Sequence, residues 1–187
     1  MKKSFTDTTQ FFSIDAGDEI VVGGRRYIVT GHERERRFGI EDPKFWVKRA
    51  GDAVTGEKKI IKLSYFESFE TTLGGVKILR YRNPQKKADI LTLTKNNPDF
   101  MQGEWFLDEK GNNIRVLDIV RGKNLFVDVG DIVLDHETYF FTILPEILRK
   151  LVAAFEAIRF LHMNGFRHGD IRSDHIMVEK KSGRYVW

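Results

Sequence analysis

The stretch from residue 166 to residue 178 constrains this chain more than any other part of it. It reads Phe-Arg-His-Gly-Asp-Ile-Arg-Ser-Asp-His-Ile-Met-Val and ends in an apolar run. Before it, apolar residues recur at helical spacing, which predicts an amphipathic helix that begins near Pro145 and ends at Asn164-Gly165. A loop between two packed elements is where functional side chains tend to lie, so we expect a functional loop here. The expected apolar face of the helix consists of Leu148, Leu151, Val152, Phe155, Ile158 and Leu161.

Asp170 is the central chemical group of this loop. Taken alone, an aspartate in a helix-to-strand turn is explained at least as well by capping of backbone amides. The order of helix, His168-Gly169-Asp170 and apolar strand favours another interpretation, because it resembles the catalytic loop of the protein-kinase superfamily. The His-Gly-Asp form is closer to the aminoglycoside-phosphotransferase-like and atypical branches than to the common His-Arg-Asp form. The resemblance extends over residues 25–187 and is strongest over residues 145–178.

The resemblance implies roles for four residues of the loop. Asp170 would orient the attacking hydroxyl group and accept its proton, and His168 would support the loop. Arg172 would neutralise charge on the transferred phosphoryl group, as a lysine does in protein kinases. His175 stands where the family has a metal-binding asparagine. Because Mg²⁺ prefers oxygen ligands, this exchange weakens the metal site or shifts it elsewhere.

The composition is that of a folded globular protein. The 187 residues are 41% hydrophobic and 31% charged, with both signs mixed, which suffices for one core or two small lobes. The formal charge of +4 suits phosphates or an acidic partner without requiring nucleic acid. The sequence has no cysteine, which excludes a disulfide framework and a zinc–thiolate site. We find no secretory leader and no membrane-spanning apolar run, so we expect a soluble cytoplasmic protein without a membrane partner.

Strand signals come first along the chain and helix signals later, which predicts an α+β fold. Strands are expected at residues 19–29, as a hairpin around Gly23-Gly24, and then at 44–50, 58–63, 105–107 and 114–117, while 64–82 has no clear pattern. Asn83-Pro84 predicts the start of a helix that runs to about residue 94. The resemblance implies an antiparallel N-lobe followed by the first helices and catalytic loop of a helical C-lobe. We therefore expect an N-terminal tail at 1–18, an N-lobe at 19–120 and a partial C-lobe at 121–187.

Lys62 is the candidate nucleotide anchor. Alone, it is better explained as an ordinary lysine near the end of a strand. Beside the loop, it resembles the ATP-binding lysine of the third kinase strand. Val47 would then cover adenine, and Leu117 would lie at the back of the site before a hinge. The cofactor-binding residues that the resemblance implies are Lys62, Val47, Leu117, Asp118 and Val120.

Two parts of the family pattern differ in this sequence. The helix position that should pair with Lys62 holds Lys87, and Glu67 and Glu70 stay open as substitutes. In place of a glycine-rich loop, a charged run joins residues 31 and 39. That run is either a solvated hairpin tip or a phosphate lid that uses its arginines.

The leading functional hypothesis is an ATP-binding, protein-kinase-like phosphotransferase with ATP and Mg²⁺ as cofactors. It would transfer the γ-phosphate to a Ser/Thr hydroxyl of a protein. Residues 185–187 resemble the strand before a D-F-G segment, so we expect an N-terminal portion of a kinase-like domain that is inactive by itself. The alternatives are a pseudokinase acting as a binding or regulatory module, and a small-molecule kinase of aminoglycoside-phosphotransferase type. Nucleic-acid binding through the arginines of 34–37 has no recognisable module behind it, so we expect no nucleic-acid partner.

Overall fold

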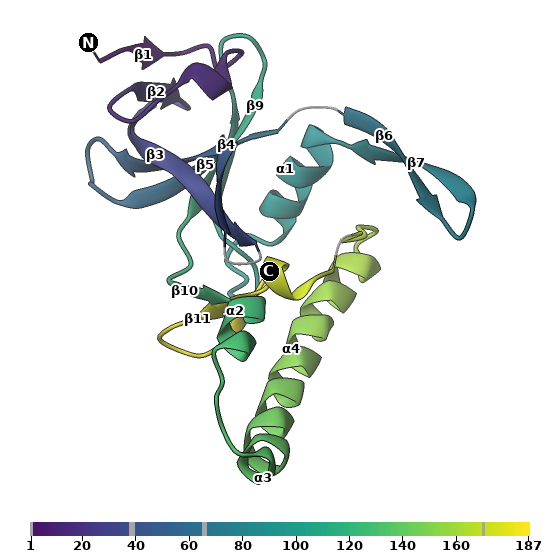
Figure 1. Cartoon of the computed structure of the whole chain (residues 1–187). Coiled ribbons are helices and arrows are strands. Elements are labelled where there is room, and N and C mark those ends of the chain that lie inside the picture. Colours follow the sequence, from purple (N-terminus) through teal and green to yellow (C-terminus); the bar gives the residue numbers. More distant parts are fainter. Residues whose placement is uncertain (1, 38–39, 65–66, 170) are drawn as a thin grey trace. The chain divides into compact units, whose positions relative to one another are not determined.

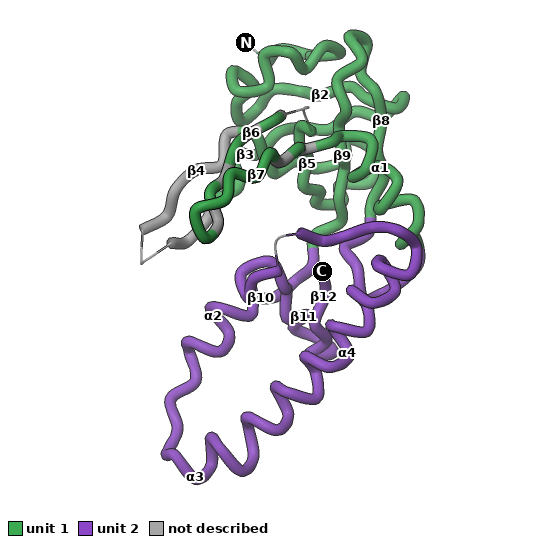
Figure 2. The backbone as a smooth tube through the Cα atoms, turned by 90° about the vertical axis from the view of Figure 1, so that its right-hand side faces the viewer, with its two compact units in different colours: residues 1–95, 103–119 green, residues 96–102, 120–187 purple. Residues whose placement is uncertain are grey.

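The computed structural model describes residues 2–37, 40–64, 67–169 and 171–187, which form two compact units. Unit 1 consists of residues 1–95 and 103–119, and unit 2 consists of residues 96–102 and 120–187 (Figure 2). The chain therefore passes between the units at 95–96, 102–103 and 119–120.

Unit 1 is built on a seven-stranded sheet with the order β1-β2-β3-β4-β5-β9-β8 (Figure 1). All neighbouring strands are antiparallel except β1 and β2. The α+β class and the mainly antiparallel sheet predicted from the sequence are thus confirmed. The strands are β1 (Ser4–Phe5), β2 (Glu19–Val22), β3 (Arg25–Arg37), β4 (Ile40–Asp52), β5 (Lys58–Ser64), β8 (Gly103–Leu107) and β9 (Asn113–Asp118).

The β2–β3 hairpin turns where two glycines were expected to turn it. Gly23 and Gly24 have φ values of 60° and 71°, a region that glycine enters without steric cost. The next hairpin differs from expectation, because residues 32–37 continue β3 instead of forming a polar connection. Residues 38 and 39, at the end of the run for which a hairpin tip and a phosphate lid were left open, lie outside the described residues.

Residues 1–18 were expected to be a tail, but Phe11 and Ile14 of this segment are buried in the core of the sheet. The 3-10 turn η1 (Phe11–Ser13) and the following Ile14 bring two fully buried side chains into one cluster with Ile61 and Val116. Thr8 adds a polar attachment, since its backbone N–H and its hydroxyl both donate to Asp108, at 2.7 and 2.6 Å. An apolar sheet face is stable only when it is shielded from water, and Phe11 and Ile14 provide this shielding here.

The opposite face of the sheet carries helix α1 (Pro84–Leu93). The helix begins as predicted, because the side chain of Asn83 accepts hydrogen bonds from the backbone of Gln85 (2.8 Å) and Lys86 (3.4 Å). It contacts β8 and β9, and the indole N–H of Trp105 donates to Thr92 at 3.3 Å.

A separate two-stranded hairpin precedes α1. Strands β6 (Glu67–Leu73) and β7 (Val76–Arg82) pair antiparallel around Gly74 and Gly75, whose φ values are 57° and 82°. The sequence interpretation left this segment open, although it has the same two-glycine signal that predicted the first hairpin.

Unit 2 contains one long helix and a small antiparallel sheet of order β10-β11-β12. Residues 185–186 form a strand, as expected, and they pair with β11. The elements are β10 (Gly122–Asn124), α2 (Leu125–Gly130), α3 (His136–Thr138), the π-helical turn η2 (Tyr139–Ile143), α4 (Leu144–Met163), η3 (Ser173–His175), β11 (Met177–Glu179) and β12 (Tyr185–Val186).

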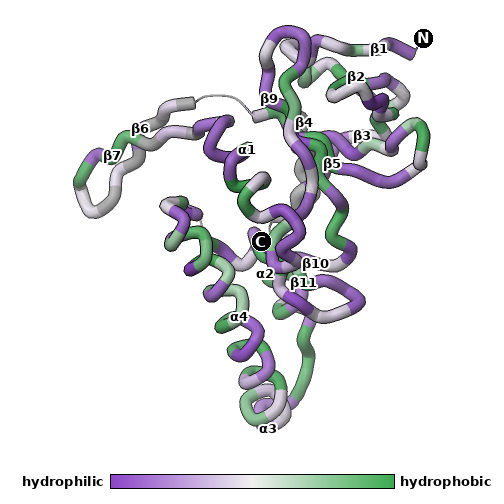
Figure 3. The backbone as a smooth tube through the Cα atoms, turned by 180° about the vertical axis from the view of Figure 1, so that it is seen from behind, coloured by the Kyte–Doolittle hydropathy of each residue, from purple (hydrophilic) through white to green (hydrophobic). Residues whose placement is uncertain are grey.

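Helix α4 has the predicted limits, but only part of the predicted apolar face is buried. Ile158 and Leu161 are buried, whereas Leu148, Val152 and Phe155 are at least half exposed. Hydrophobic and hydrophilic residues alternate along this helix, as Figure 3 shows. The buried side is completed by two small residues, Ala154 and Ala157, which the periodicity of large side chains did not indicate.

Candidate functional site

The loop between α4 and β11 has the position that the sequence predicted. Helix α4 ends at Asn164 and Gly165, where Gly165 has a φ of 80° and the backbone N–H of Phe166 returns to the carbonyl of Leu161 at 2.9 Å. The chain then runs to the short turn η3 and enters β11, which pairs antiparallel with β10 and β12. Asp170, the proposed catalytic residue, lies outside the described residues.

His168 and His175 approach each other in this loop, although six residues separate them in sequence. Their ring centroids are 6.4 Å apart, and the His168 ring lies 4.9 Å from the ring of Trp187. Trp187 is itself anchored, because its indole N–H donates to the carbonyl of Ala154 in α4 at 2.8 Å. The sequence did not indicate Trp187 as a site residue, and its only signal was an apolar strand end.

Arg172 is held by two neighbours in the same loop. Its Nη2 lies 2.5 Å from Nε2 of His175, and its Nε lies 3.3 Å from a carboxylate oxygen of Asp174. A guanidinium can only donate, so Nε2 of His175 is the acceptor and the proton of a neutral imidazole is then on Nδ1. The structure therefore brings Arg172 and His175 together.

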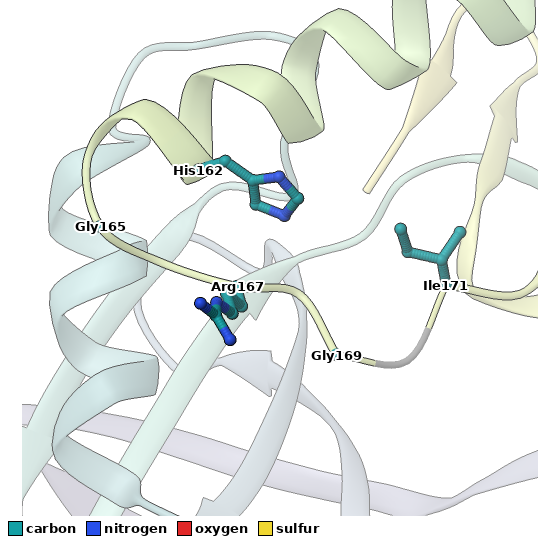
Figure 4. A pocket seen from close by; sticks show the side chains of 5 residues that line it. All are labelled: His162, Gly165, Arg167, Gly169 and Ile171. Carbon is teal, nitrogen blue, oxygen red and sulfur yellow. The ribbon is translucent and has the colours of Figure 1, made fainter.

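An open hollow of about 670 Å³ lies beside this loop. Figure 4 shows its five lining residues, which come from the end of α4 and from the loop. None of the described catalytic candidates lines it, but its wall includes Gly169, the residue next to Asp170. The lining residues are His162, Gly165, Arg167, Gly169 and Ile171.

The described residues do not assemble a magnesium site. Among them, no group of three His, Asp or Glu side chains is placed to hold a metal ion. His175, the candidate at the metal position, offers a nitrogen that already accepts from Arg172. Magnesium prefers oxygen ligands, so His175 does not fit that ion.

The candidate nucleotide residues of unit 1 lie on adjacent strands. Val47 on β4 is directly opposite Lys62 on β5, so both side chains are on the sheet face that carries α1. Val47 and Leu117 are buried, whereas Asp118 is exposed and pairs with Lys59 at 2.8 Å. Val120, the last of the set, is half-buried and belongs to unit 2.

Glu33 is an acidic neighbour of Lys62 that the sequence interpretation did not single out. Its carboxylate accepts two hydrogen bonds from Arg49, at 2.7 and 2.9 Å. Burial would raise the pKa of Glu33, but the hydrogen bonds from Arg49 and the backbone of Arg34, with the charges of Arg49 and Lys62, lower it overall. Of the two glutamates left open as partners of Lys62, Glu70 pairs with Lys77 at 2.9 Å. The side chain of Glu67 lies outside the described set.

Comparisons with known proteins identify no family for this chain. No protein-family model matches it, and no curated protein matches it. It is similar to a crystal structure of Rad53 1-466 in complex with AMP-PNP, with 20% identity and a TM-score of 0.47. The match covers 75% of this chain and 33% of that one, so the chain spans about a third of that protein's length. A likeness of this extent assigns neither a fold family nor a function.

The class that the structure defines is an α+β protein of two units. One unit places Lys62 on an antiparallel sheet, and the other places a polar loop between a long helix and a small sheet. Within the described residues, no helix is long and apolar enough to cross a membrane.

Proposed function

We propose that this chain is part of an ATP-binding, protein-kinase-like phosphotransferase. The observation that carries the proposal is the loop after α4, in which Arg172 and His175 are in contact and His168 packs on Trp187. Support comes also from Lys62, which lies on a central strand beside the buried Val47. This pattern of a lysine on an antiparallel sheet and a His-Gly-Asp loop is the one that the sequence resemblance implies.

The residues of the chain have distinct tasks in the proposed reaction. Asp170 orients the acceptor hydroxyl group and takes its proton as the hydroxyl oxygen bonds to the γ-phosphorus. The bond from that phosphorus to the bridging oxygen breaks, and ADP leaves. Arg172 offsets negative charge on the phosphoryl group, while Lys62 holds the phosphates of ATP. His168 keeps the loop in place through its contact with Trp187.

Magnesium is proposed as a cofactor because it neutralises the phosphates in this class of reaction. The described residues offer only His175 at the expected metal position, and an imidazole is a poor magnesium ligand. No step of the mechanism is therefore assigned to the metal.

A binding module is the second candidate function. His175 favours it. This residue brings no oxygen ligand to the expected metal position, and its Nε2 is occupied by Arg172. Such a protein would bind nucleotide, or only a protein partner, without phosphate transfer.

The test is to measure nucleotide binding by this chain with calorimetry, and phosphate transfer from γ-labelled ATP by a longer protein that contains this chain and a D-F-G segment, because the chain alone is expected to be inactive. The acceptors are casein, an aminoglycoside and the chain itself, and the variants are Asp170→Asn, Lys62→Met and the control Asp131→Asn. Asp131 is exposed and pairs with Lys123. An active protein should lose about a hundredfold or more in rate with Asp170→Asn while ATP affinity is kept.

Three outcomes separate the candidates. Transfer that depends on Asp170 supports the phosphotransferase. Binding of ATP that depends on Lys62, without transfer by the longer protein that includes the D-F-G segment, contradicts the phosphotransferase and favours the binding module. Transfer at equal rates in the wild type and Asp170→Asn removes Asp170 from the mechanism.

A further inference from the structure

Arg115 lies directly opposite Lys62 in the sheet of unit 1. Strands β5 and β9 pair antiparallel, and the register places Lys62 against Arg115 and Arg115 against Trp105. Side chains that face each other in this way share one face, with Cβ atoms about 4.5–5.5 Å apart. Two cations are therefore neighbours on the face that carries Lys62, an arrangement that is unfavourable without a compensating anion.

The described residues around Arg115 supply no such anion. Its Nε donates to the hydroxyl of Ser64 at 3.0 Å, and Ser64 is buried and uncharged. Among the residues that the structure describes, no carboxylate forms an ion pair with Arg115. Burial lowers the pKa of Arg115 to about 10, and no charge from the described residues opposes that effect. A largely buried cation without a counter-charge destabilises the folded state.

Helix α1 does not supply the missing charge either. It covers the Arg115 side of the sheet, where Trp105 donates to Thr92 and where Ala88 and Leu91 are buried. The helix has one acidic residue, Asp89, which is exposed and accepts a hydrogen bond from Gln85 at 2.7 Å. Glu33, an acidic group whose charge acts on Lys62, is bound through both carboxylate oxygens to Arg49.

We propose that Arg115 and Lys62 together form a two-cation site for the phosphate groups of a bound polyphosphate, with Arg115 as a binding residue beyond the proposed ATP anchor. This inference rests on the proposed function, since it names a further residue of the same nucleotide site. The guanidinium is suited to the task because its donors form a planar fork that matches phosphate oxygens. Ser64 holds Nε, which leaves both terminal nitrogens of Arg115 to donate to the ligand.

A bound polyphosphate accounts for the unfavourable pairing of two cations. The bound anion would supply the counter-charge that Arg115 lacks, and affinity for the ligand would be gained at the expense of stability in the free protein. Sites that bind ligands commonly show this opposition between stability and function.

The experiment uses the full chain and three probes, which are inorganic tripolyphosphate, ATP and adenosine. Calorimetry gives affinities and thermal unfolding gives the midpoint temperature for the wild type, Arg115→Met, Arg115→Lys and Lys62→Met. Arg26→Met is the control, because Arg26 is an exposed cation of the same sheet with only a 3.8 Å contact to Glu19.

We expect Arg115→Met to weaken tripolyphosphate and ATP binding about tenfold or more and to leave adenosine binding unchanged. The same substitution should raise the midpoint temperature of the free protein, because it removes a buried charge that has no partner. Arg115→Lys should keep part of the affinity, since lysine keeps the charge but loses the fork of donors. The control should change neither quantity.

Equal tripolyphosphate affinity in the wild type and Arg115→Met would overturn the inference, as would an equal loss in the Arg26→Met control. If Arg115→Met does not fold, the anion affinity of Arg115→Lys is the deciding measurement. A purely structural role of Arg115 predicts the same anion affinity in Arg115→Lys as in the wild type. If ATP affinity is unchanged in Arg115→Met but lost in Lys62→Met, this inference is overturned and the proposed function is kept. Tripolyphosphate binding through both cations, without ATP binding, would support the two-cation site and overturn the proposed function.

Discussion

Nζ of Lys48 lies 3.0 Å from Nδ1 of His32, and the lysine side chain is completely buried between β4 and the N-terminal segment. Nε2 of the same imidazole lies 3.2 Å from a carboxylate oxygen of Asp15, and the ring of Phe11 lies 5.2 Å from the ammonium group. A charged lysine can only donate, so His32 accepts at Nδ1 and donates from Nε2 to Asp15. Through these contacts, Phe11 and Asp15 of the N-terminal segment are attached to Lys48 and His32 of the sheet.

Lys48 should make the stability of unit 1 depend on alkaline pH. Burial lowers the pKa of Lys48 to about 8 from 10.5. Between these values the unfolded chain binds a proton that the folded chain does not, so the free energy of unfolding from this group rises as pH increases from about 8 to 10.5. Lys48→Met should remove that slope and stabilise the protein at pH 7 by on the order of 2 kcal/mol.

Urea unfolding at several pH values measures both effects. The exposed Lys58→Met is the control, and an unchanged slope in Lys48→Met would contradict the prediction.

Phe11 and Phe12 should differ sharply as sites of substitution. Phe11 is fully buried in the sheet core, whereas its neighbour is 55% exposed. Phe11→Ala should lower the free energy of unfolding by about 3–5 kcal/mol, because it leaves a cavity in the core. Phe12→Ala should change it by about 0.5 kcal/mol or less. Chemical denaturation of both variants measures the difference, and similar values would mean that residues 1–18 are the loose tail expected from the sequence.

The cap of helix α1 should be measurable at Asn83. Its side chain accepts hydrogen bonds from the first backbone amides of the helix, so Asn83→Ala should cost about 1 kcal/mol of stability. Asn83→Asp keeps the accepting oxygen and should retain most of that stability. The comparison uses denaturant midpoints, and equal losses in the two variants would show that the cap bond is not the cause.

Gly122 in β10 should not tolerate a side chain. A Cβ atom at this position would collide with the backbone carbonyl of Val178 in β11, whereas a Cβ atom at Gly130 would meet nothing within 4 Å. Gly122→Ala should therefore separate the paired strands and lower stability by about 3 kcal/mol or more. Gly130→Ala, in the same unit, is the control and should be nearly neutral. Hydrogen exchange at the amides of β11 reports on the pairing directly, and unchanged protection in Gly122→Ala would refute the collision.

Local patterns in the sequence predicted the local elements well, because they act over a few neighbouring residues. The two glycines at 23–24 require a tight turn, Asn83-Pro84 starts a helix, and Asn164-Gly165 ends one. The position of the His168 loop between helix and strand follows from the same signals. The β6–β7 hairpin could have been predicted in this way from Gly74-Gly75.

The tertiary structure alone decided which surfaces are covered and which distant residues meet. Periodicity gave α4 an apolar face, but it could not indicate that Ala154 and Ala157 pack inside while Phe155 stays exposed. Strand register placed Arg115 beside Lys62, and chain folding placed Trp187 on His168. These contacts join residues far apart in sequence, so they depend on the packing of whole elements and no local pattern encodes them.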